Sequence, residues 1–450
     1  MKNTITLLGL LFAVNALATD RFVDPNLSQG NGTTLFTSIT DAVGAAENGD
    51  RIIIASSIYN EDDLTIDKSI QIIPQTAGAT INFNANILIS GFAGMNLEII
   101  GFNIGAYSIN SNSGGNVTSL ANINLINVEA YNINFDHNYL YPTIISSSIQ
   151  HEIIIRNGNI IKTTTNKLFV YDEPGENEEN NKILISNNTI DNLLQLFNNN
   201  KKIIVANNSL HDLFITDWNK NESIKNEIIN NRFLSKPPAG QNCDYDGIND
   251  GTNPRIHISV LGSVGSCCNY YSGSSVSRYN FIFSSNLFSS QPFFSSFENT
   301  SSYMDNYSTS QSKYFLRNQY NCGGSYLEFL NGWGFNNSDS AFPNNNSNGF
   351  FEWSYNGIDI PIDNSSANNL SFTTIIGPTE ATDGGNTNHK YYDIDLTIND
   401  RGINGGPYSQ LNYNAANPNN SRAFIFDLDM PVDLFPGQDV QIKAKGYHKN

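Results

Sequence analysis

Charged residues are scarce in this sequence, and basic residues are the scarcest. Only 15% of the 450 residues are charged, and 24 Lys and Arg stand against 42 Asp and Glu, a net charge of −18. Nucleic-acid binding relies on Lys and Arg to neutralise phosphates, so this composition excludes nucleic acid as a predicted partner. Direct binding of a polyanionic glycan is also disfavoured, unless a cation bridges the two.

Hydrophobic runs long enough to cross a membrane are missing as well. The apolar run at residues 5–14 is too short for a bilayer span, which takes about 20 residues. Lys2 precedes this run and the small-x-small sequence Ala16-Leu17-Ala18 follows it, which is the pattern of a secretory signal peptide. We therefore predict a signal peptide over 1–18, cleaved after Ala18, and a secreted or cell-surface protein with no transmembrane segment in the mature chain.

Helical periodicity is missing over most of the chain, yet 39% of the residues are hydrophobic. The apolar runs are short and rich in β-branched residues, with Asn, Gly and Ser between them, and this pattern predicts strands joined by turns. The octets ILISNNTI (183–190) and IIVANNSL (203–210) share one pattern and start 20 residues apart. Variants occur at 97–104, 153–160, 226–234 and 281–288. Short strands that repeat without crossover helices predict an all-β parallel β-helix, a solenoid whose units stack on one another.

The asparagine pairs in the octets, Asn187-Asn188 and Asn207-Asn208, are predicted to shape the corners of this solenoid. Asn tolerates the left-handed backbone region that a corner requires, and stacked Asn side chains can hydrogen-bond along the axis. The alternative interpretation is that these side chains contact a ligand.

One helix is predicted, over residues 36–50. Apolar residues recur there at helical spacing, Thr37 or Ser38 can cap the start, and Gly49 stands at the end. An open solenoid end exposes unpaired strand edges, so we expect this helix to act as an N-terminal cap.

Two segments resemble known proteins. Residues 38–74 resemble the opening of pectin-lyase-like right-handed β-helix proteins, with a capping helix, Gly-Asp, a first strand and a Tyr-x-Glu-like turn. Residues 381–409 resemble the closing coil of secreted bacterial β-helix repeat proteins. The matched positions are Asp383, Gly384, Gly385, Asn386, Asp393, Asp395, Asn399, Asp400, Gly402, Gly405 and Gly406. The resemblance implies a right-handed parallel β-helix over 19–410, but that superfamily includes enzymes, adhesins and other proteins, so it does not fix a function.

The repeat weakens between residues 235 and 350, where we expect long side-loop insertions. The cysteines of the chain all lie there: Cys243, Cys267, Cys268 and Cys322. Export permits disulfides, and we expect Cys267 and Cys268 to bond separately to Cys243 and Cys322, with free thiols as the alternative. The tail, 411–450, alternates like antiparallel strands and is predicted to form a short C-terminal strand extension or cap.

The best local ligand motif is NCDYDGINDGTN (242–253). Asn242, Asp244, Asp246 and Asp250 fall at alternate positions typical of a calcium loop, although the acidic residue at its last position is missing. Ca²⁺ is therefore a candidate cofactor, and a turn rich in Asn and Asp that Cys243 pins is the other interpretation.

Aromatic residues crowd the same loop-rich region. Tyr270, Tyr271, Tyr303 and Trp333 are candidates for stacking on sugar rings, and packing of the loops onto the helix is the alternative.

The catalytic sets known for enzymes of this resemblance are absent. There is no Gly-His-Gly and no Arg-Ile-Lys, and the Asp62-Asp63 pair falls in a predicted loop. We therefore expect an exported, non-catalytic protein that binds a glycan or a protein partner at the cell surface. The alternatives are a lyase-like polysaccharide-degrading enzyme and a structural subunit of an envelope assembly.

Overall fold

The computed structural model of the protein describes most of the chain up to residue 234 and separate segments beyond it. The described residues are 18–112, 120–171, 182–197, 201–216, 226–234, 255–259, 280–284, 287–288, 293–297, 315–321, 324–330, 350–354, 357–358, 373–374, 383, 385, 387–393, 397–400, 402–409, 423–429 and 443–448.

In this part of the chain, one 13-stranded sheet, sheet A, is ordered almost as its strands occur in the sequence. Its strands are β2 (Leu35–Phe36), β1 (Asp20–Val23), β3 (Arg51–Ile54), β6 (Gln71–Pro74), β9 (Asn96–Ile100), β12 (Ala121–Ile126), β14 (Leu140–Ile145), β16 (Asn159–Ile161), β18 (Lys182–Ser186), β20 (Lys202–Ala206), β22 (Asn226–Ile229), β25 (Asn280–Ser284) and β30 (Phe350–Ser354). Every pairing within it is parallel.

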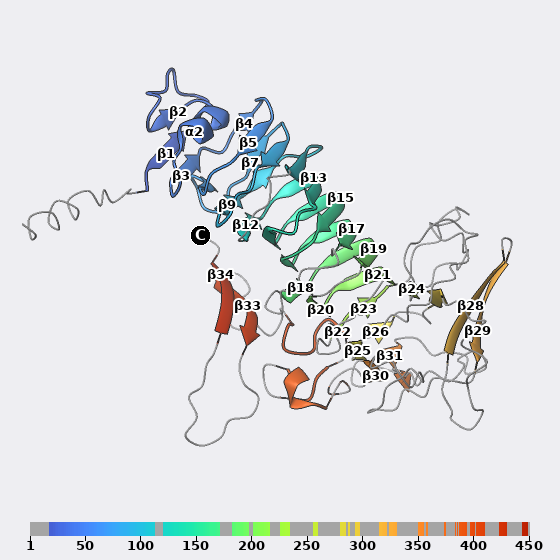
Figure 1. Cartoon of the computed structure of the whole chain (residues 1–450). Coiled ribbons are helices and arrows are strands. Elements are labelled where there is room, and N and C mark those ends of the chain that lie inside the picture. Colours follow the sequence, from blue (N-terminus) through green and yellow to red (C-terminus); the bar gives the residue numbers. More distant parts are fainter. Residues whose placement is uncertain are drawn as a thin grey trace, which may run out of the picture.

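The second parallel sheet, sheet B, has 17 strands. From β3 onward, each strand of sheet A is followed in the sequence by one or two strands of sheet B. Its strands are β4 (Ile58–Tyr59), β5 (Leu64–Ile66), β7 (Ile81–Phe83), β8 (Ile87–Ile89), β10 (Phe102–Asn103), β11 (Ser108–Ser111), β13 (Glu129–Phe135), β15 (Ser148–Ile155), β17 (Thr164–Val170), β19 (Thr189–Phe197), β21 (Ser209–Thr216), β23 (Arg232–Phe233), β24 (Arg255–Ser259), β26 (Leu287–Phe288), β27 (Phe293–Phe297), β31 (Gly357–Ile358) and β32 (Thr373–Thr374). One repeat unit is thus a strand of sheet A followed by one or two strands of sheet B. Figure 1 shows these units stacked along one axis, from the blue end toward β25 and β30.

The remaining elements lie outside the two parallel sheets. Two antiparallel pairs join β28 (Phe315–Asn321) to β29 (Gly324–Leu330) and β33 (Ala423–Asp429) to β34 (Lys443–His448). The helices among the described residues are α2 (Ile39–Ala45) and the short 3-10 helix η2 (His389–Tyr391). None of the described helices has the length and apolar character needed to pass through a lipid bilayer.

The core follows from the two-residue period of a strand, which sends alternate side chains inward. Ile52, Ile72 and Ile99 lie in register on neighbouring strands of sheet A, and each is 0% exposed. On sheet B, Leu64 pairs with Ile87 in the same way. Identical or similar apolar residues therefore stack from unit to unit. The chain is all-β with long parallel sheets and almost no helix, as predicted, and this architecture is consistent with a β-solenoid.

Helix α2 lies within the predicted range 36–50 but is shorter. Ser38 is its N-cap and accepts a hydrogen bond from the Asp41 amide (3.1 Å). The helix cannot begin at Phe36, because Phe36 belongs to β2 and pairs with Val23. It ends where Ala46 takes an extended conformation, with φ −71° and ψ 153°.

The asparagine pairs form the corners between the two sheets, and their two members have different roles. Asn187 and Asn207 take the left-handed conformation, each with φ 58°. Asn188 and Asn208 point inward and are buried. The Asn188 amide group donates to Asn208 Oδ1 (2.9 Å), and the Asn208 amide group donates in turn to Asn231 Oδ1 (2.9 Å). Only the second asparagine of each pair therefore joins the predicted ladder.

Candidate functional site

An open, polar groove of about 800 Å³ lies on the outer face of sheet B, near the N-terminal end of the stack. Its walls come from the ends of β4, β7 and β10 and from the turns that follow them. The lining residues are Asn60, Glu61, Asp62, Asn82, Asn84, Asn103, Ile104, Gly105, Ala106 and Tyr107.

Strand register brings the asparagines of the groove together. Asn82 lies opposite Ile58 on one neighbouring strand and Asn103 on the other. Ile81 and Phe83, on either side of Asn82, are 0% exposed, so strand alternation turns Asn82 outward. The groove is therefore a row of outward positions on consecutive repeat units.

The turn after β4 is held rigidly by its own side chains. The Tyr59 hydroxyl donates to Ala55 O (2.9 Å), and burial raises the pKa of Tyr59 well above its ordinary value. The Glu61 carboxylate accepts from the Ile39 amide (2.7 Å) and the Thr40 amide (2.8 Å), at the start of α2. Glu61 thus lines the groove, but its carboxylate oxygens already accept hydrogen bonds from the first amides of α2.

Other lining groups are available to a ligand. Asn84 Nδ2 donates to Asn60 Oδ1 (2.6 Å), and Asn103 Oδ1 accepts from the Gly105 amide (2.9 Å). An Asn side chain has two N–H donors and an oxygen that accepts, so each of these asparagines keeps further hydrogen-bonding capacity beyond the bond described. Asp62 and Asn82 have no side-chain hydrogen bond to any described residue. The groove therefore presents one carboxylate and one amide, those of Asp62 and Asn82, without a side-chain hydrogen bond to any described residue.

An exposed aromatic strip, formed by Tyr107, Tyr131 and His151, continues from the groove along sheet B. Tyr107 is 38% exposed and Tyr131 is 41% exposed. The Tyr131 amide donates to Tyr107 O (2.8 Å), which places these residues on neighbouring units. The rings of Tyr131 and His151 are stacked, with centroids 5.3 Å apart and planes 5° apart. Exposed rings beside unpaired amides are the combination that binds amphipathic ligands.

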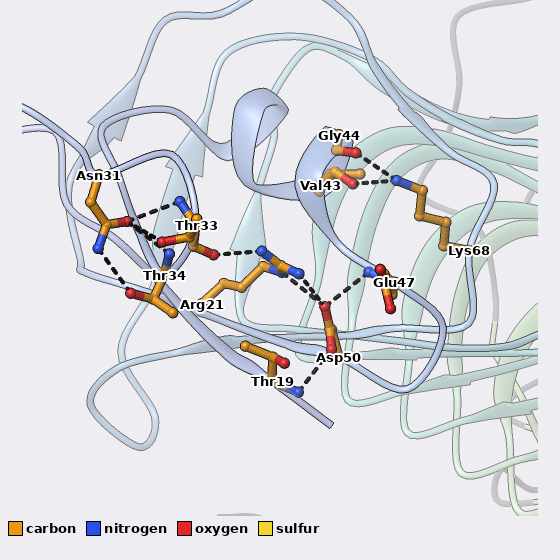
Figure 2. A network of polar contacts seen from close by, with 10 residues as sticks. All are labelled: Thr19, Arg21, Asn31, Thr33, Thr34, Val43, Gly44, Glu47, Asp50 and Lys68. Carbon is orange, nitrogen blue, oxygen red and sulfur yellow. Dashed lines mark hydrogen bonds and ion pairs between the residues drawn. The ribbon is translucent and has the colours of Figure 1, made fainter. Parts of the chain in front are cut away.

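A buried polar network joins the first described residues of the chain to the start of β3 (Figure 2). Asp50 accepts hydrogen bonds from the Thr19 amide (2.8 Å), the Glu47 amide (2.9 Å) and Arg21 Nε (2.8 Å). Lys68 Nζ donates to Gly44 O (2.7 Å) near the end of α2. Burial raises the pKa of Asp50, but the two backbone hydrogen bonds and the Arg21 guanidinium outweigh it and hold the pKa below its ordinary value.

Substituting Asp50→Asn is expected to lower the free energy of unfolding at pH 7 by about 2 kcal/mol, because it leaves the Arg21 guanidinium without its buried counter-charge. Since the folded-state pKa of Asp50 is depressed, its contribution is fully present above the unfolded-state pKa and is lost as pH falls from there through the lower folded-state pKa. Denaturant titrations of both proteins between pH 7 and pH 2 test this, and the difference between them should shrink in acid.

The matched control is Asp20→Asn. Asp20 also bonds an arginine, Arg51 (2.6 Å), but the two side chains are 40% and 44% exposed. Exposed ion pairs contribute little to stability, so this substitution should have a much smaller effect. If both variants lost the same free energy of unfolding, the buried Asp50–Arg21 pair would stabilise the fold no more than the exposed pair does.

The residues singled out from the sequence as ligands lie outside the described residues. They are the calcium candidates Asn242, Asp244, Asp246 and Asp250, the cysteines Cys243, Cys267, Cys268 and Cys322, and the aromatic candidates Tyr270, Tyr271, Tyr303 and Trp333. Calcium binding, the disulfides and the aromatic contacts remain predictions. Elsewhere, among the residues with described positions, no group of three or more metal-ligating side chains is found.

The groove and the aromatic strip were not predicted from the sequence. A signal for them exists, because INFNAN (81–86) and FNIGAY (102–107) alternate apolar residues with Asn and end near an aromatic residue or a turn. What the sequence does not state is the register that places Asn82 beside Asn103.

The class of protein that these observations define is an all-β protein with long parallel sheets and a polar groove on one flank. No protein-family model, curated protein or solved structure matches the chain.

Proposed function

We propose that this is an exported, pectin-lyase-like right-handed β-helix protein that binds a neutral glycan, without turnover, on the outer face of sheet B. The observation that carries the proposal is the groove, where unpaired amide and carboxylate groups adjoin an exposed tyrosine. The signal peptide predicted over 1–18 supports export of the protein, and glycans are ligands that an exported protein can meet.

The chemistry of the groove favours a carbohydrate over a purely apolar ligand. Sugar hydroxyls both donate and accept hydrogen bonds, and the side chains of Asn60, Asn82 and Asn84 can do the same. The flat faces of sugar rings are apolar, and Tyr107 offers an exposed ring at the edge of the groove. An open groove along a stack of identical units also suits a chain with a repeating structure.

The charge of the groove favours a neutral ligand over an acidic one. Asp62 and Glu61 line it, no Lys or Arg does, and the chain carries a net charge of −18. Like charges would repel an anionic polysaccharide unless a cation intervened. This argument also supports binding rather than lyase chemistry on an acidic polysaccharide, because a lyase would need to attract such a substrate.

Substituting Tyr107→Ala is expected to weaken glycan binding at least tenfold, about 1.4 kcal/mol, through loss of the stacking ring. The measurement is isothermal titration with a panel of soluble neutral polysaccharides, together with polygalacturonate and alginate as acidic ones. Only neutral members should bind, and Asn82→Ala should weaken binding as well.

The matched control is Phe22→Ala, which removes a ring of similar exposure, 39%, from sheet A instead of sheet B. This variant should bind as the unaltered protein does. Absence of binding to every neutral polysaccharide, or equal affinity of the Tyr107→Ala variant, would refute the proposal. Release of unsaturated or reducing ends would show a polysaccharide-degrading enzyme, and capture only by envelope proteins would favour an assembly subunit.

A further inference from the structure

A segment near the C-terminus lies along the outer face of sheet A, although the strands that it touches are far away in the sequence. This segment, the strap, comprises the described residues between 387 and 409, and Figure 1 shows it in orange beside the green strands. Asn187 Nδ2 donates to Tyr408 O (2.8 Å), Asn207 Nδ2 donates to Gly405 O (2.6 Å) and Asn230 Nδ2 donates to Asp400 O (2.6 Å). The strap therefore runs back along the stack, one repeat unit after another.

The donors in these bonds share one conformation and one position in the repeat unit. Asn187, Asn207 and Asn230 are the first asparagines of their pairs, with φ 58°, 58° and 56°. The left-handed corner turns each of these amide groups toward the strap, while the second asparagine of each pair turns inward to the ladder. Each donor bonds a backbone carbonyl of the strap, so the contact repeats at these three consecutive units.

The strap also covers apolar side chains that face outward. Leu184 and Ile204 lie in register on β18 and β20 and are 0% and 2% exposed. They belong to a cluster separate from the main core, to which the strap contributes Tyr391 and against which Tyr408 packs. Its other buried members are Ile126, Ile145, Ile161, Ala206 and Ile229. Outward positions of a solenoid are polar unless something covers them, and burying these side chains stabilises the docked strap.

A buried charge completes the interface. Glu227 is 1% exposed, and Glu227 Oε1 lies 2.5 Å from Lys390 Nζ and 2.9 Å from Lys202 Nζ. Burial raises the pKa of Glu227, but the two ammonium groups outweigh it and hold the pKa below its ordinary value. The strap thus supplies one of the two positive charges that a buried carboxylate on β22 requires.

Glycines allow the strap to come this close. A Cβ atom on Gly405 would lie 2.0 Å from Asp400 O, and one on Gly406, which has φ 77°, would lie 2.6 Å from Asn230 Oδ1. The first contact is within the strap and the second is between the strap and a corner.

We infer that the strap is a lateral lock: the repeat units of β18, β20 and β22 reach their full stability only when it is docked, and its release opens an apolar flank. The Asn207 to Gly405 bond spans 198 positions, so these units precede the strap by nearly two hundred residues. The strap therefore docks only after the intervening chain has been synthesised. Local opening of this kind is measured by hydrogen exchange.

The test is hydrogen–deuterium exchange of the full chain, read by mass spectrometry, with the double substitution Asn207→Gly and Asn230→Gly. Glycine keeps the left-handed corner but removes the amide groups that bind the strap. We expect about tenfold faster exchange in the strap and in residues 203–206 and 226–229, with residues 51–74 unchanged.

The matched control is Asn127→Gly, a corner asparagine with φ 54° whose side chain bonds no described residue of the strap. It should leave exchange of the strap unchanged. Should the double variant fail to fold, Lys390→Met acts from the side of the strap and should accelerate the same amides. Unprotected strap amides in the unaltered chain, or equal acceleration by Asn127→Gly, would overturn the inference.

Discussion

Substituting Asn208→Ala is expected to lower the free energy of unfolding by about 4 kcal/mol. Asn208 is 0% exposed, and its side chain accepts from Asn188 N (2.9 Å) and donates to Ile185 O (2.9 Å). Alanine would leave both buried groups without a partner, at a cost of about 1–3 kcal/mol each, and would open a small cavity in the ladder. Denaturant unfolding followed by circular dichroism measures the loss.

The control for this substitution is Asn122→Ala. Asn122 also joins two units, through Nδ2 to Asn96 Oδ1 (3.0 Å), but the bond is exposed to solvent. Water replaces an exposed hydrogen bond, so we expect a loss below about 0.5 kcal/mol. Similar losses in the two variants would mean that the inner ladder contributes no more than a surface contact.

The second large effect is expected for Gly158→Ala. Gly158 has φ 101°, and an added Cβ atom would lie 1.9 Å from Pro142 O on β14. The substitution therefore combines backbone strain with a clash against the main chain of the neighbouring strand, which cannot move aside as a side chain can. We expect a loss of about 4 kcal/mol, measured by the same unfolding experiment.

Gly78→Ala separates the two causes. Gly78 also has a positive φ, 76°, but nothing lies within 4 Å of the added atom. Only the conformational cost remains, and we expect about 1 kcal/mol. If Gly158→Ala lowered the free energy of unfolding by no more than this, the main chain of β14 at Pro142 would have shifted to relieve the clash.

The two parts of the chain for which we propose roles depend on the same stacking. On sheet B, stacking aligns outward asparagines into the groove. On sheet A, it aligns the corner asparagines that bind the strap, such as Asn187 and Asn207. The groove and the strap lie on different sheets, so the strap experiment and the glycan experiment can fail independently.

Much of the architecture could be read from local pattern. The apolar octets at 183–190 and 203–210 correspond to β18 and β20 and to the starts of β19 and β21. Alternation and turn residues are local properties, which explains why strands and corners were predictable. The extent of α2 was not predictable in this way, because Phe36, expected in its first turn, pairs with Val23 as part of β2.

For the candidate site, the sequence predicted a binding surface along the flank of the stacked strands, but not the residues that line the groove. A glycan-binding flank was expected, but the residues chosen for it came from the loop-rich region 235–350. Those residues lie outside the described part of the chain and stay predictions, whereas the groove forms from residues such as Asn60, Asn82 and Tyr107, which neighbouring units align. No single unit contains the site, so the local patterns at 81–86 and 102–107 do not define it without the register that joins them.

An all-β chain of short repeated strands, low in positive charge and with asparagines at its corners, follows from the residues and their spacing alone. These properties depend on residue type and on spacing over a few positions. Three features required the folded chain: which asparagine of each pair turns inward, which side chains share the groove, and the contact of Lys390 with Glu227. The reason is register: stacking joins residues about 20 to 200 positions apart, and a pairing at that distance is set by the packing of whole units.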